Sequence, residues 1–474
     1  MLEKEVLVTQ YHKKTDIVVI GSGLAGLAAA IEAGQTGASV IVLEKMKITG
    51  GNTRISDGGL SAPGNYLQKQ QGIEDSIALF CDDMLKAGLG LNHPALVRVV
   101  AERATEAIDW TIKELGVRYL DRLDRFGGHS VARSLTTRSH SGVDIIKAQT
   151  AKLDQLGIKV RTQCLFTGFV TDPDGEVCGV NIREGYRFPD KNSGVAKNIR
   201  ADRAVVLTTG GFSNDHVFRS KLHPGLDKTI QSTNHRGATA EGLVAALTLN
   251  AFPVHLSWIQ LGPWGCSDEK GYGKGSRFAS YCLFPAGILV DPAIGQRIVN
   301  EWADRRERSE AMIKTGHSCI GIVDAVGSEK DAESLRDCLK SGKVKAFKRL
   351  ENLAATYDIP QESLKQTVAA YNDAVASGKR DEFGKALGPD AFPITTPPFY
   401  AIRLYPKVHY TPGGIGIDEK ARVIDLDGCP IPRLYAAGEV TGGVHGASRL
   451  GSNALTECLV FGRIAGQEAA ALPG

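Results

Sequence analysis

An apolar run, a glycine-rich turn, a helical stretch and a second apolar run follow one another within about 30 residues near the start of the chain. Residues 16–20 form the first run, of the kind expected for a strand buried on both faces. Gly21-Ser-Gly-Leu-Ala-Gly26 follows it, and an alanine-rich stretch extends to Gly34. Residues 38–43 form the second run, which ends at Glu44. This order predicts a βαβ unit and therefore a parallel sheet covered by helices.

The glycines of this unit suit a dinucleotide site. Gly21 permits the tight turn, Gly23 lets a pyrophosphate approach the backbone, and Gly26 allows close packing of helix and strand. The helix N-terminus offers N–H groups and a positive dipole end to phosphates. Glu44 can accept hydrogen bonds from ribose hydroxyls, which favours an unphosphorylated ribose. A tight turn that binds nothing is the alternative, and the flanking runs and Glu44 disfavour it.

Two later segments repeat the pattern of an apolar run that enters a glycine turn. Residues 204–209 lead into Gly210, and residues 434–437 lead into Gly438. Such segments, spread over most of the chain, predict one sheet assembled from distant parts of the sequence. Residues 303–380 differ, because amphipathic helical patterns dominate them. This stretch is expected to be an insertion, with residues 335–357 and 361–376 as its clearest helices.

Composition excludes several classes of protein. A length of 474 residues favours two domains, and a net charge of +3 argues against nucleic acid or membrane-surface binding. No apolar run is long enough to span a bilayer, and the N-terminus lacks the apolar segment of a secretory signal. The nine cysteines include no C-x-x-C pair, which argues against a disulfide framework, a metal site or an iron–sulfur cluster. A cytoplasmic protein without a metal is expected.

The segment Lys45-Met-Lys-Ile-Thr-Gly-Gly-Asn-Thr-Arg-Ile-Ser-Asp-Gly-Gly59 distinguishes FAD from NAD. A domain that binds only NAD has no reason to place paired glycines and small polar residues directly after the second strand. A second signature, Gly438-Glu-Val-Thr-Gly-Gly-Val-His-Gly-Ala-Ser-Arg-Leu-Gly-Ser-Asn-Ala-Leu455, adds one acid, one arginine and a helix start. Together these segments predict a backbone that closes around a large cofactor.

These motifs resemble the fumarate reductase and succinate dehydrogenase flavoproteins of the FAD-dependent oxidoreductase 2 family, to which urocanate reductase and the 3-ketosteroid dehydrogenases are related. The resemblance covers most of the chain. It implies an α/β fold with a Rossmann-like FAD-binding domain and an inserted α+β capping domain. The expected boundaries are 1–254 and 406–474 for the FAD-binding domain and 255–405 for the capping domain.

The resemblance also implies the residues that contact the flavin. In the membrane-bound members a histidine of the Lys45–Gly59 loop bonds covalently to the flavin, and Asn52 stands at that position here, so noncovalent FAD is expected. Glu439 is expected to accept from ribityl hydroxyls, and the N–H groups at Ser452 and Asn453 to face the flavin O2 region. The expected cofactor-binding residues are Gly21, Gly23, Ala25, Gly26, Glu44, Lys45, Gly50, Gly51, Asn52, Thr53, Ser56, Gly58, Gly59, Thr209, Gly210, Gly438, Glu439, Ser452, Asn453 and Leu455.

Three substrate-site residues follow from the same resemblance. His409, in His-Tyr-Thr-Pro-Gly-Gly, and Arg449, in Gly-Ala-Ser-Arg-Leu-Gly, match residues that bind and polarise the substrate. Arg305 matches the arginine that acts as proton donor. Taken without the family, Arg305 lies in a charged run typical of a solvated helix face, and His409 suits a structural role. His129 and His445 are open to either a packing or a supporting role.

The chain departs from fumarate reductases at two places. Gly262 stands where their histidine holds a substrate carboxylate, and Ser280 and Leu283 stand where a Glu and an Arg form their proton relay. These departures argue against fumarate as the substrate. Aromatic residues in the same region suit a larger and less charged enoate or enone, with core packing as an equal alternative. They are Trp264, Tyr272, Phe278, Tyr281 and Phe284, of which Tyr281 is the candidate substitute relay.

The predicted function is FAD-dependent hydride transfer to an activated C=C bond of an α,β-unsaturated carboxylate, with aryl or branched acids as candidates. A 3-ketosteroid dehydrogenase-like enzyme and a non-catalytic flavin-binding or electron-transfer protein are the alternatives. The chain ends at Gly474, shortly after the last signature, and carries no haem or covalent-FMN segment. A separate electron donor or acceptor is therefore expected beside the small-molecule substrate.

Overall fold

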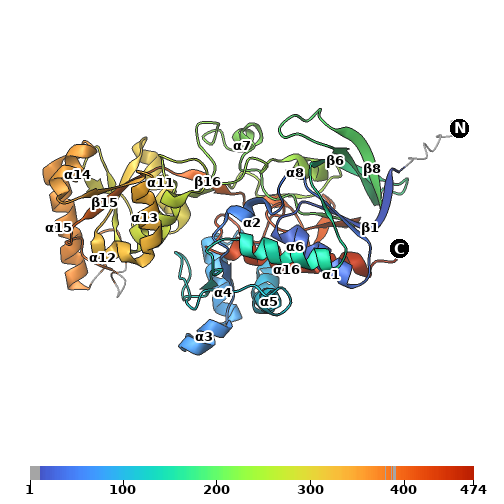
Figure 1. Ribbon diagram of the computed structural model, residues 1–474, viewed down its shortest axis with the longest axis horizontal. Coiled ribbons are helices and arrows are strands. Elements are labelled where there is room, and N and C mark those ends of the chain that lie inside the picture. Colours follow the sequence, from blue (N-terminus) through green and yellow to red (C-terminus); the bar gives the residue numbers. More distant parts are fainter. Residues whose placement is uncertain (1–10, 379, 386, 388–390) are drawn as a thin grey trace. The chain divides into compact units, whose positions relative to one another are not determined.

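A computed structural model describes residues 11–378, 380–385, 387 and 391–474 (Figure 1). The chain divides into two compact units. The first comprises residues 1–218, 236–258 and 411–474, and the second comprises residues 219–235 and 259–410. The boundaries 254/255 and 405/406 expected from the sequence remain a proposal beside this division.

The first unit is built on one sheet whose strands come from distant parts of the sequence, as predicted. Its central path runs β18 (Arg422–Ile424), β19 (Pro430–Ala436), β8 (Val195–Leu207), β1 (Lys13–Ile20), β2 (Val40–Leu43) and β5 (Val160–Arg161). The path from β19 to β5 is parallel, and β18 is antiparallel to β19. A hairpin of β6 (Cys164–Thr171) and β7 (Val177–Glu184) joins through β7 to β8. The carboxyl ends of β1, β8 and β19 therefore lie side by side, where ligands bind in such sheets.

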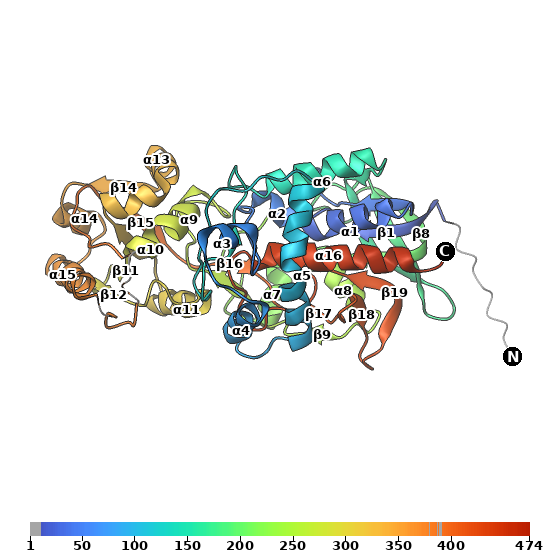
Figure 2. The same cartoon turned by 90° about the horizontal axis from the view of Figure 1, so that it is seen from below.

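Two helices of the first unit pack with almost no space between their backbones. These are α1 (Leu24–Gln35) and α16 (Asn453–Ala471), which run side by side in Figure 2. A Cβ at Gly462 would lie 2.5 Å from the carbonyl oxygen of Ala25, and one at Gly466 would lie 2.3 Å from that of Ala29. Glycine is therefore needed at both positions, and α16 is held firmly against the turn after β1.

The remaining elements of the first unit surround this core. They are α2 (Gly51–Ile55), β3 (Leu60–Ser61), α3 (Tyr66–Gln71), α4 (Ile77–Ala87), α5 (Pro94–Lys113), β4 (Ser134–Leu135), α6 (Val143–Gln155), α8 (Glu241–Leu247), β9 (Pro253–Val254) and β17 (Gly414–Ile415), while α7 (His216–Leu222) passes from the first unit to the second.

The second unit has an antiparallel sheet with helices. Its strand order is β12 (Gln296–Arg297), β11 (Ile288–Asp291), β13 (Cys319–Val323), β15 (Phe399–Leu404) and β14 (Val344–Phe347). A separate ribbon pairs β10 (Gln260–Gly262) with β16 (Lys407–Tyr410). Its helices are α9 (Lys274–Phe278), a π-helix (Ala279–Leu283), α10 (Phe284–Ala286), α11 (Arg305–Thr315), α12 (Ala325–Ser328), a 3-10 turn (Glu329–Asp331), α13 (Ala332–Lys340), α14 (Leu350–Thr356) and α15 (Gln361–Ser377).

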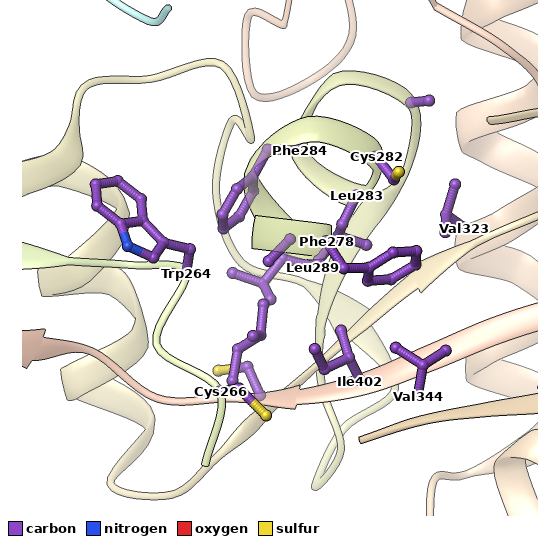
Figure 3. Packing of buried hydrophobic residues seen from close by; sticks show 14 of the residues in the cluster. Trp264, Cys266, Phe278, Cys282, Leu283, Phe284, Leu289, Val323, Val344 and Ile402 are labelled. Atoms are coloured by element: carbon purple, nitrogen blue, oxygen red, sulfur yellow. The ribbon is translucent and has the colours of Figure 1, made fainter. Parts of the chain in front are cut away.

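One predicted helix of this unit is wrong. Residues 335–357 were expected to be a single helix, but α13 ends at Lys340, β14 follows, and α14 begins at Leu350. Val344 is fully buried in the sheet, so tertiary packing overrides the helical pattern there. Figure 3 shows residues of the hydrophobic core of this unit, which includes Trp264, Cys266 and Phe284.

Within the described residues, no helix is long and apolar enough to cross a membrane.

Candidate active site

The turn after β1 has the geometry that a dinucleotide requires. Gly21 has a φ of +108°, and a Cβ at Gly26 would lie 2.0 Å from the Gly21 carbonyl oxygen. Only glycine allows this approach. At Gly23, by contrast, no atom of the described chain lies within 4 Å of an added Cβ. The turn is therefore tight on its inner side and open at Gly23, where a pyrophosphate would lie.

Glu44 holds this turn at the end of β2. Its carboxylate accepts hydrogen bonds from the Ser22 hydroxyl at 2.6 Å and from the Met46 N–H at 2.8 Å. Lys45 points its ammonium group to Glu241 at 3.0 Å. Burial raises the pKa of Glu241, but Lys45 and nearby hydrogen bonds outweigh it and lower that pKa to about 2. The Lys45 ammonium is thus held by an acid, so any cofactor contact of Lys45 rests on its backbone.

The loop after β2 meets the N-terminus of α16. Gly50, Gly51 and Gly58 all have positive φ angles. A Cβ at Gly59 would lie 2.5 Å from the Ser452 hydroxyl oxygen. Ser452 itself caps α16 with a φ of +61°, an uncommon conformation for a residue with a side chain. The two glycine-rich signatures predicted for the cofactor are therefore in contact.

Glu439 joins these signatures to a third segment. Its carboxylate accepts hydrogen bonds from the Thr411 N–H at 3.0 Å and from the Asn52 amide at 3.4 Å. Burial raises the pKa of Glu439 to about 7, against the opposing effects of the Thr411 N–H and Arg449. A carboxyl that titrates near neutrality can accept hydrogen bonds when ionised and donate one when protonated. Both forms suit a ligand hydroxyl.

Several polar groups in this part of the chain have no internal partner. Both side-chain polar atoms of Asn453 and the hydroxyl of Thr209 are buried without a hydrogen bond to any described residue. At Gly210, no described atom lies within 4 Å of an added Cβ. Leaving a buried polar group unpaired costs about 1–3 kcal/mol, so such groups indicate a missing ligand. Together with the open Gly23, they fit an extended dinucleotide such as FAD.

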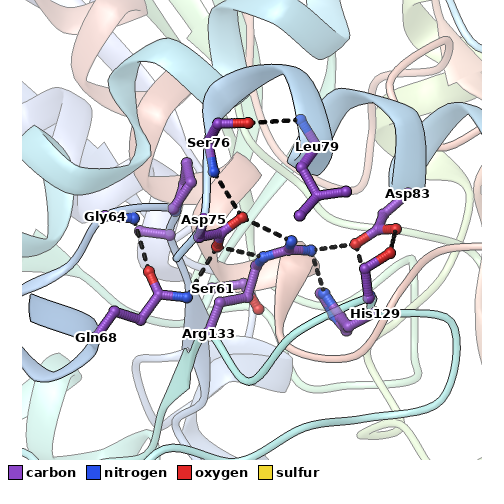
Figure 4. A network of polar contacts seen from close by, with 12 residues as sticks. Ser61, Gly64, Gln68, Asp75, Ser76, Leu79, Asp83, His129 and Arg133 are labelled. Atoms are coloured by element: carbon purple, nitrogen blue, oxygen red, sulfur yellow. Dashed lines mark hydrogen bonds and ion pairs between the residues drawn. The ribbon is translucent and has the colours of Figure 1, made fainter. Parts of the chain in front are cut away.

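A buried network supports the backbone ahead of Ser452 (Figure 4). Arg133 is fully buried and binds Asp75 at 2.8 Å and Asp83 at 2.5 Å. It also donates to Nδ1 of His129 at 3.0 Å, so the ring proton lies on Nε2. Nε2 then donates to the Gly451 carbonyl at 2.9 Å. His129 therefore has a supporting role, which the sequence had left open.

Arg449 and His445 lie in the same signature. Arg449 is buried, and one of its nitrogens donates to the Leu450 carbonyl at 2.9 Å. His445 lies 2.9 Å from the Glu457 carboxylate of α16, and both side chains are buried. The Thr441 hydroxyl donates to the other oxygen of Glu457 at 3.1 Å. His445 thus anchors the signature to α16.

Arg305 begins α11 in the second unit. Asp304 caps this helix by accepting from the Glu307 N–H at 3.0 Å. The Arg305 guanidinium donates to the Gln260 amide oxygen at 3.4 Å and lies over the Trp264 ring at 4.5 Å. Arg305 is therefore held by two side chains, unlike Arg306, which pairs with exposed Glu310. Gln260 is a supporting residue that the sequence analysis missed.

His409 lies against the same indole. Its ring centroid is 5.0 Å from that of Trp264 at an interplanar angle of 84°, and 6.3 Å from that of Tyr272. Nδ1 of His409 is 2.7 Å from the Thr233 hydroxyl. No sequence signal pointed to Thr233, which is 176 residues away in the chain. The structure thus brings Arg305 and His409 together around Trp264, whereas Arg449 belongs to the first unit.

The other aromatic residues fall into two groups. Phe278 and Phe284 belong to the same hydrophobic core as Trp264, which agrees with core packing, the equal alternative to a ring-lined pocket. Tyr281 lies in the π-helix, and Arg277, paired with Asp331 at 2.8 Å, lies 6.0 Å from its ring. π-helical turns are frequent at functional sites. A relay role for Tyr281 stays a prediction.

Comparison with known proteins identifies a family model and relatives that match this chain. The family model described as "FAD binding domain" matches residues 16–455. The acrylate reductase flavoprotein subunit of Shewanella woodyi is 40% identical, over 96% of this chain and 91% of its own length. The urocanate reductase of Eggerthella lenta is 34% identical, over 96% of this chain and 75% of its own length.

Solved structures of flavin-dependent and steroid-converting enzymes have a similar fold. The open conformation of a flavocytochrome c3 fumarate reductase superposes with a TM-score of 0.79 at 32% identity, over 97% of this chain and 78% of that one. A 3-ketosteroid-Δ4-(5α)-dehydrogenase from Rhodococcus jostii shares the fold, with a TM-score of 0.77 at 24% identity, over 98% and 99% of the two chains. The matched range contains the open glycine turn, the unpartnered polar groups and both signatures, and the chain therefore belongs to the FAD binding domain family of FAD-dependent oxidoreductases.

Proposed function

We propose that this flavoprotein reduces the C=C bond of an α,β-unsaturated acid that carries a single carboxylate. The observation that carries the proposal is the cluster of Arg305, His409 and Trp264 beside Gly262, which offers a guanidinium and an imidazole but no side chain at position 262. FAD, when bound, supplies the hydride. The acrylate and urocanate reductases among the relatives support this class of substrate, and the fumarate reductases support reduction of a C=C bond beside a carboxylate.

The chain's own residues supply the proton and hold the substrate. Arg305 is the proposed proton donor, because Gln260 and Trp264 fix its guanidinium. Its pKa is ordinarily above about 12, so it acts only if it is reprotonated after each turnover. His409, fixed by Thr233, and Arg449 are the proposed ligands of the carboxylate. They polarise the double bond by stabilising the negative charge that develops on the carboxylate side.

A single carboxylate is favoured over two by the strand β10. Gly262 contributes no side chain, so position 262 offers no side-chain donor for a second carboxylate. A dicarboxylate would leave one charged group without its partner, which costs more than a missing apolar contact. Fumarate is therefore a poor substrate in this proposal, and an acid such as acrylate is a good one.

The flavin is held without a covalent bond in this proposal, because Asn52 has no nucleophilic ring nitrogen. Denaturation with acid should release all yellow colour into the supernatant. Colour that stays with the precipitated chain would contradict it.

A separate electron donor and a cytoplasmic location belong to the same proposal. Activity of the purified chain with an artificial electron donor would test whether the donor is a separate molecule.

The decisive experiment is an anaerobic titration. The photoreduced protein is mixed with acrylate, methacrylate, crotonate, cinnamate, fumarate, urocanate and a 3-ketosteroid, and flavin reoxidation is followed by absorbance. Rapid reoxidation by monocarboxylic enoates, at least roughly tenfold faster than by fumarate, supports the proposal. Preference for fumarate or the steroid contradicts it. Reoxidation by none of the compounds supports a non-catalytic flavoprotein.

A further inference from the structure

Trp264 occupies a special place in the second unit, because one indole contacts both Arg305 and His409. The guanidinium lies over the ring face at 4.5 Å from its centroid, and the imidazole meets the ring edge-on at 5.0 Å. A ligand that touches both Arg305 and His409 must therefore lie next to this ring. Trp264 follows β10 directly and is only 5% exposed, so its position is set by packing.

The Trp264 ring leaves little space for a side chain at Gly262. A Cβ at Gly262 would lie 3.0 to 3.2 Å from three ring atoms of Trp264, namely Cε2, Cζ2 and Nε1. Such contacts are closer than side chains normally make, so a larger residue at 262 would push the indole away. The glycine and the tryptophan therefore act as one unit, in which the ring takes the space of the missing side chain.

The ring has little room to swing away. The chain turns tightly behind it, with the Gly265 N–H donating to the Gly262 carbonyl at 3.2 Å and the Tyr405 N–H donating to the Gly265 carbonyl at 2.8 Å. A Cβ at Gly265 would lie 2.4 Å from the Tyr405 carbonyl oxygen, so this turn is close to the connection between β15 and β16. Trp264 also belongs to the hydrophobic core that includes Cys266 and Phe284 (Figure 3). A Trp264 ring that cannot move would limit the space available to a substrate beside Arg305 and His409.

We propose that Trp264 is a specificity-determining residue that closes the substrate site beside Arg305 and His409 and limits it to short enoates of the size of acrylate. The inference rests on the proposed function, because it assumes that the substrate contacts these two residues. The ring would clash with a large substituent on the β-carbon, such as the phenyl group of cinnamate. The proposal concerns the volume of the ring; its indole N–H is also buried without an acceptor among the described residues, and Trp264→Phe tests that group separately.

Three variants separate the effect of the Trp264 ring volume from the effects of its N–H group and of losing a buried indole. Trp264→Leu opens space, and Trp264→Phe keeps an aromatic wall while it removes the N–H. Trp110→Leu is the matched control, since Trp110 is a similarly buried indole of the first unit with the Arg463 guanidinium 5.1 Å from its ring. The measured quantity is the ratio of kcat/KM for cinnamate to kcat/KM for acrylate. A ratio is needed because loss of the ring also loosens Arg305 and lowers all rates.

The wild-type protein should prefer acrylate, and Trp264→Leu should raise the cinnamate-to-acrylate ratio by roughly tenfold or more. Trp264→Phe and Trp110→Leu should leave it within about threefold. Calorimetric titration gives a readout apart from turnover: 3-phenylpropanoate should bind more tightly to Trp264→Leu than to the wild type, relative to propanoate. An unchanged ratio in a folded, flavin-loaded Trp264→Leu protein would overturn the inference, as would equal use of both acids by the wild type.

The two proposals fail in different ways. If no enoate reoxidises the wild-type flavin, the proposed function is wrong. If short enoates do so but Trp264→Leu leaves both the kinetic ratio and the relative binding of the saturated acids unchanged, only the role of Trp264 is wrong. A fall in the ratio for Trp264→Phe alone would assign the effect to the indole N–H and also overturn the argument from volume.

Discussion

Replacing Glu439 with glutamine should make the stability of the flavin-free protein less dependent on pH. Burial raises the pKa of this carboxyl from an ordinary 4.5 to about 7, although Thr411 and Arg449 oppose the change. A carboxyl whose pKa is higher in the folded protein stabilises the fold while it is protonated, and this stabilisation is lost as the pH rises through about 7. Glutamine keeps the shape and cannot ionise.

The magnitude follows from the two pKa values. The difference between 4.5 and about 7, at about 1.36 kcal/mol for each pH unit, gives on the order of 3 kcal/mol. Most of this stabilisation, on the order of 2 to 3 kcal/mol, is lost between pH 5 and pH 8. Relative to Glu439→Gln, the wild-type free energy of unfolding should therefore decrease by this amount over that interval.

Urea unfolding of the flavin-free proteins, followed by tryptophan fluorescence, measures this difference. Glu102→Gln is the control, because Glu102 is an exposed residue of α5 that pairs with Arg98, and its replacement reports the general effect of removing a surface carboxylate. A flat difference for Glu439 would refute the reasoning. A difference of opposite sign would mean that Arg449 and the Thr411 N–H stabilise the carboxylate more than burial destabilises it.

Three further outcomes are expected. If Tyr281 serves as the relay for the proton donor, Tyr281→Phe should lower kcat at least roughly tenfold and change its pH profile while substrate binding stays constant, and an unchanged profile would exclude the role. Thr233→Val removes the 2.7 Å hydrogen bond to His409 and should raise KM about fivefold with little change in flavin content, which steady-state kinetics and absorbance will show. Asp83→Asn breaks the buried ion pair with Arg133 and should cost about 3 kcal/mol or more in urea unfolding, whereas a loss below about 1 kcal/mol would show that the network is not stabilising.

The glycine turn after β1 could be predicted from sequence because its chemistry is local. The order of apolar run, spaced glycines and terminal acid predicted β1, α1 and β2, and the structure has them at Lys13–Ile20, Leu24–Gln35 and Val40–Leu43. A Cβ at Gly26 would lie 2.0 Å from the Gly21 carbonyl oxygen in the same turn, whereas one at Gly21 would lie 2.3 Å from the carbonyl oxygen of Thr208, which follows β8. The glycine at position 26 thus has a cause within a few residues, and the pattern and the structure agree there.

The charged run at residues 304–308 shows where the sequence pattern alone was not enough. Residues 304–308 read as one solvated helix face, but their three arginines have different surroundings. Arg305 is held by Gln260 and Trp264, Arg306 pairs with an exposed acid, and Arg308 is buried over Phe284, where burial lowers its pKa to about 10. What distinguishes them is packing against segments far away in the chain, which the run itself does not encode.

The relation between Gly262 and Trp264 also required the structure, and it changes how the sequence difference from fumarate reductases is understood. In sequence, the missing histidine at 262 and the tryptophan at 264 are two separate departures. In the structure they are linked, because a Cβ at position 262 would lie only 3.0 to 3.2 Å from three atoms of the Trp264 ring. A side chain at position 262 therefore requires the Trp264 ring to shift by at least a few tenths of an ångström, and this ring is the one over which the Arg305 guanidinium lies. A second carboxylate clamp at this strand would thus also disturb the support of the proposed proton donor.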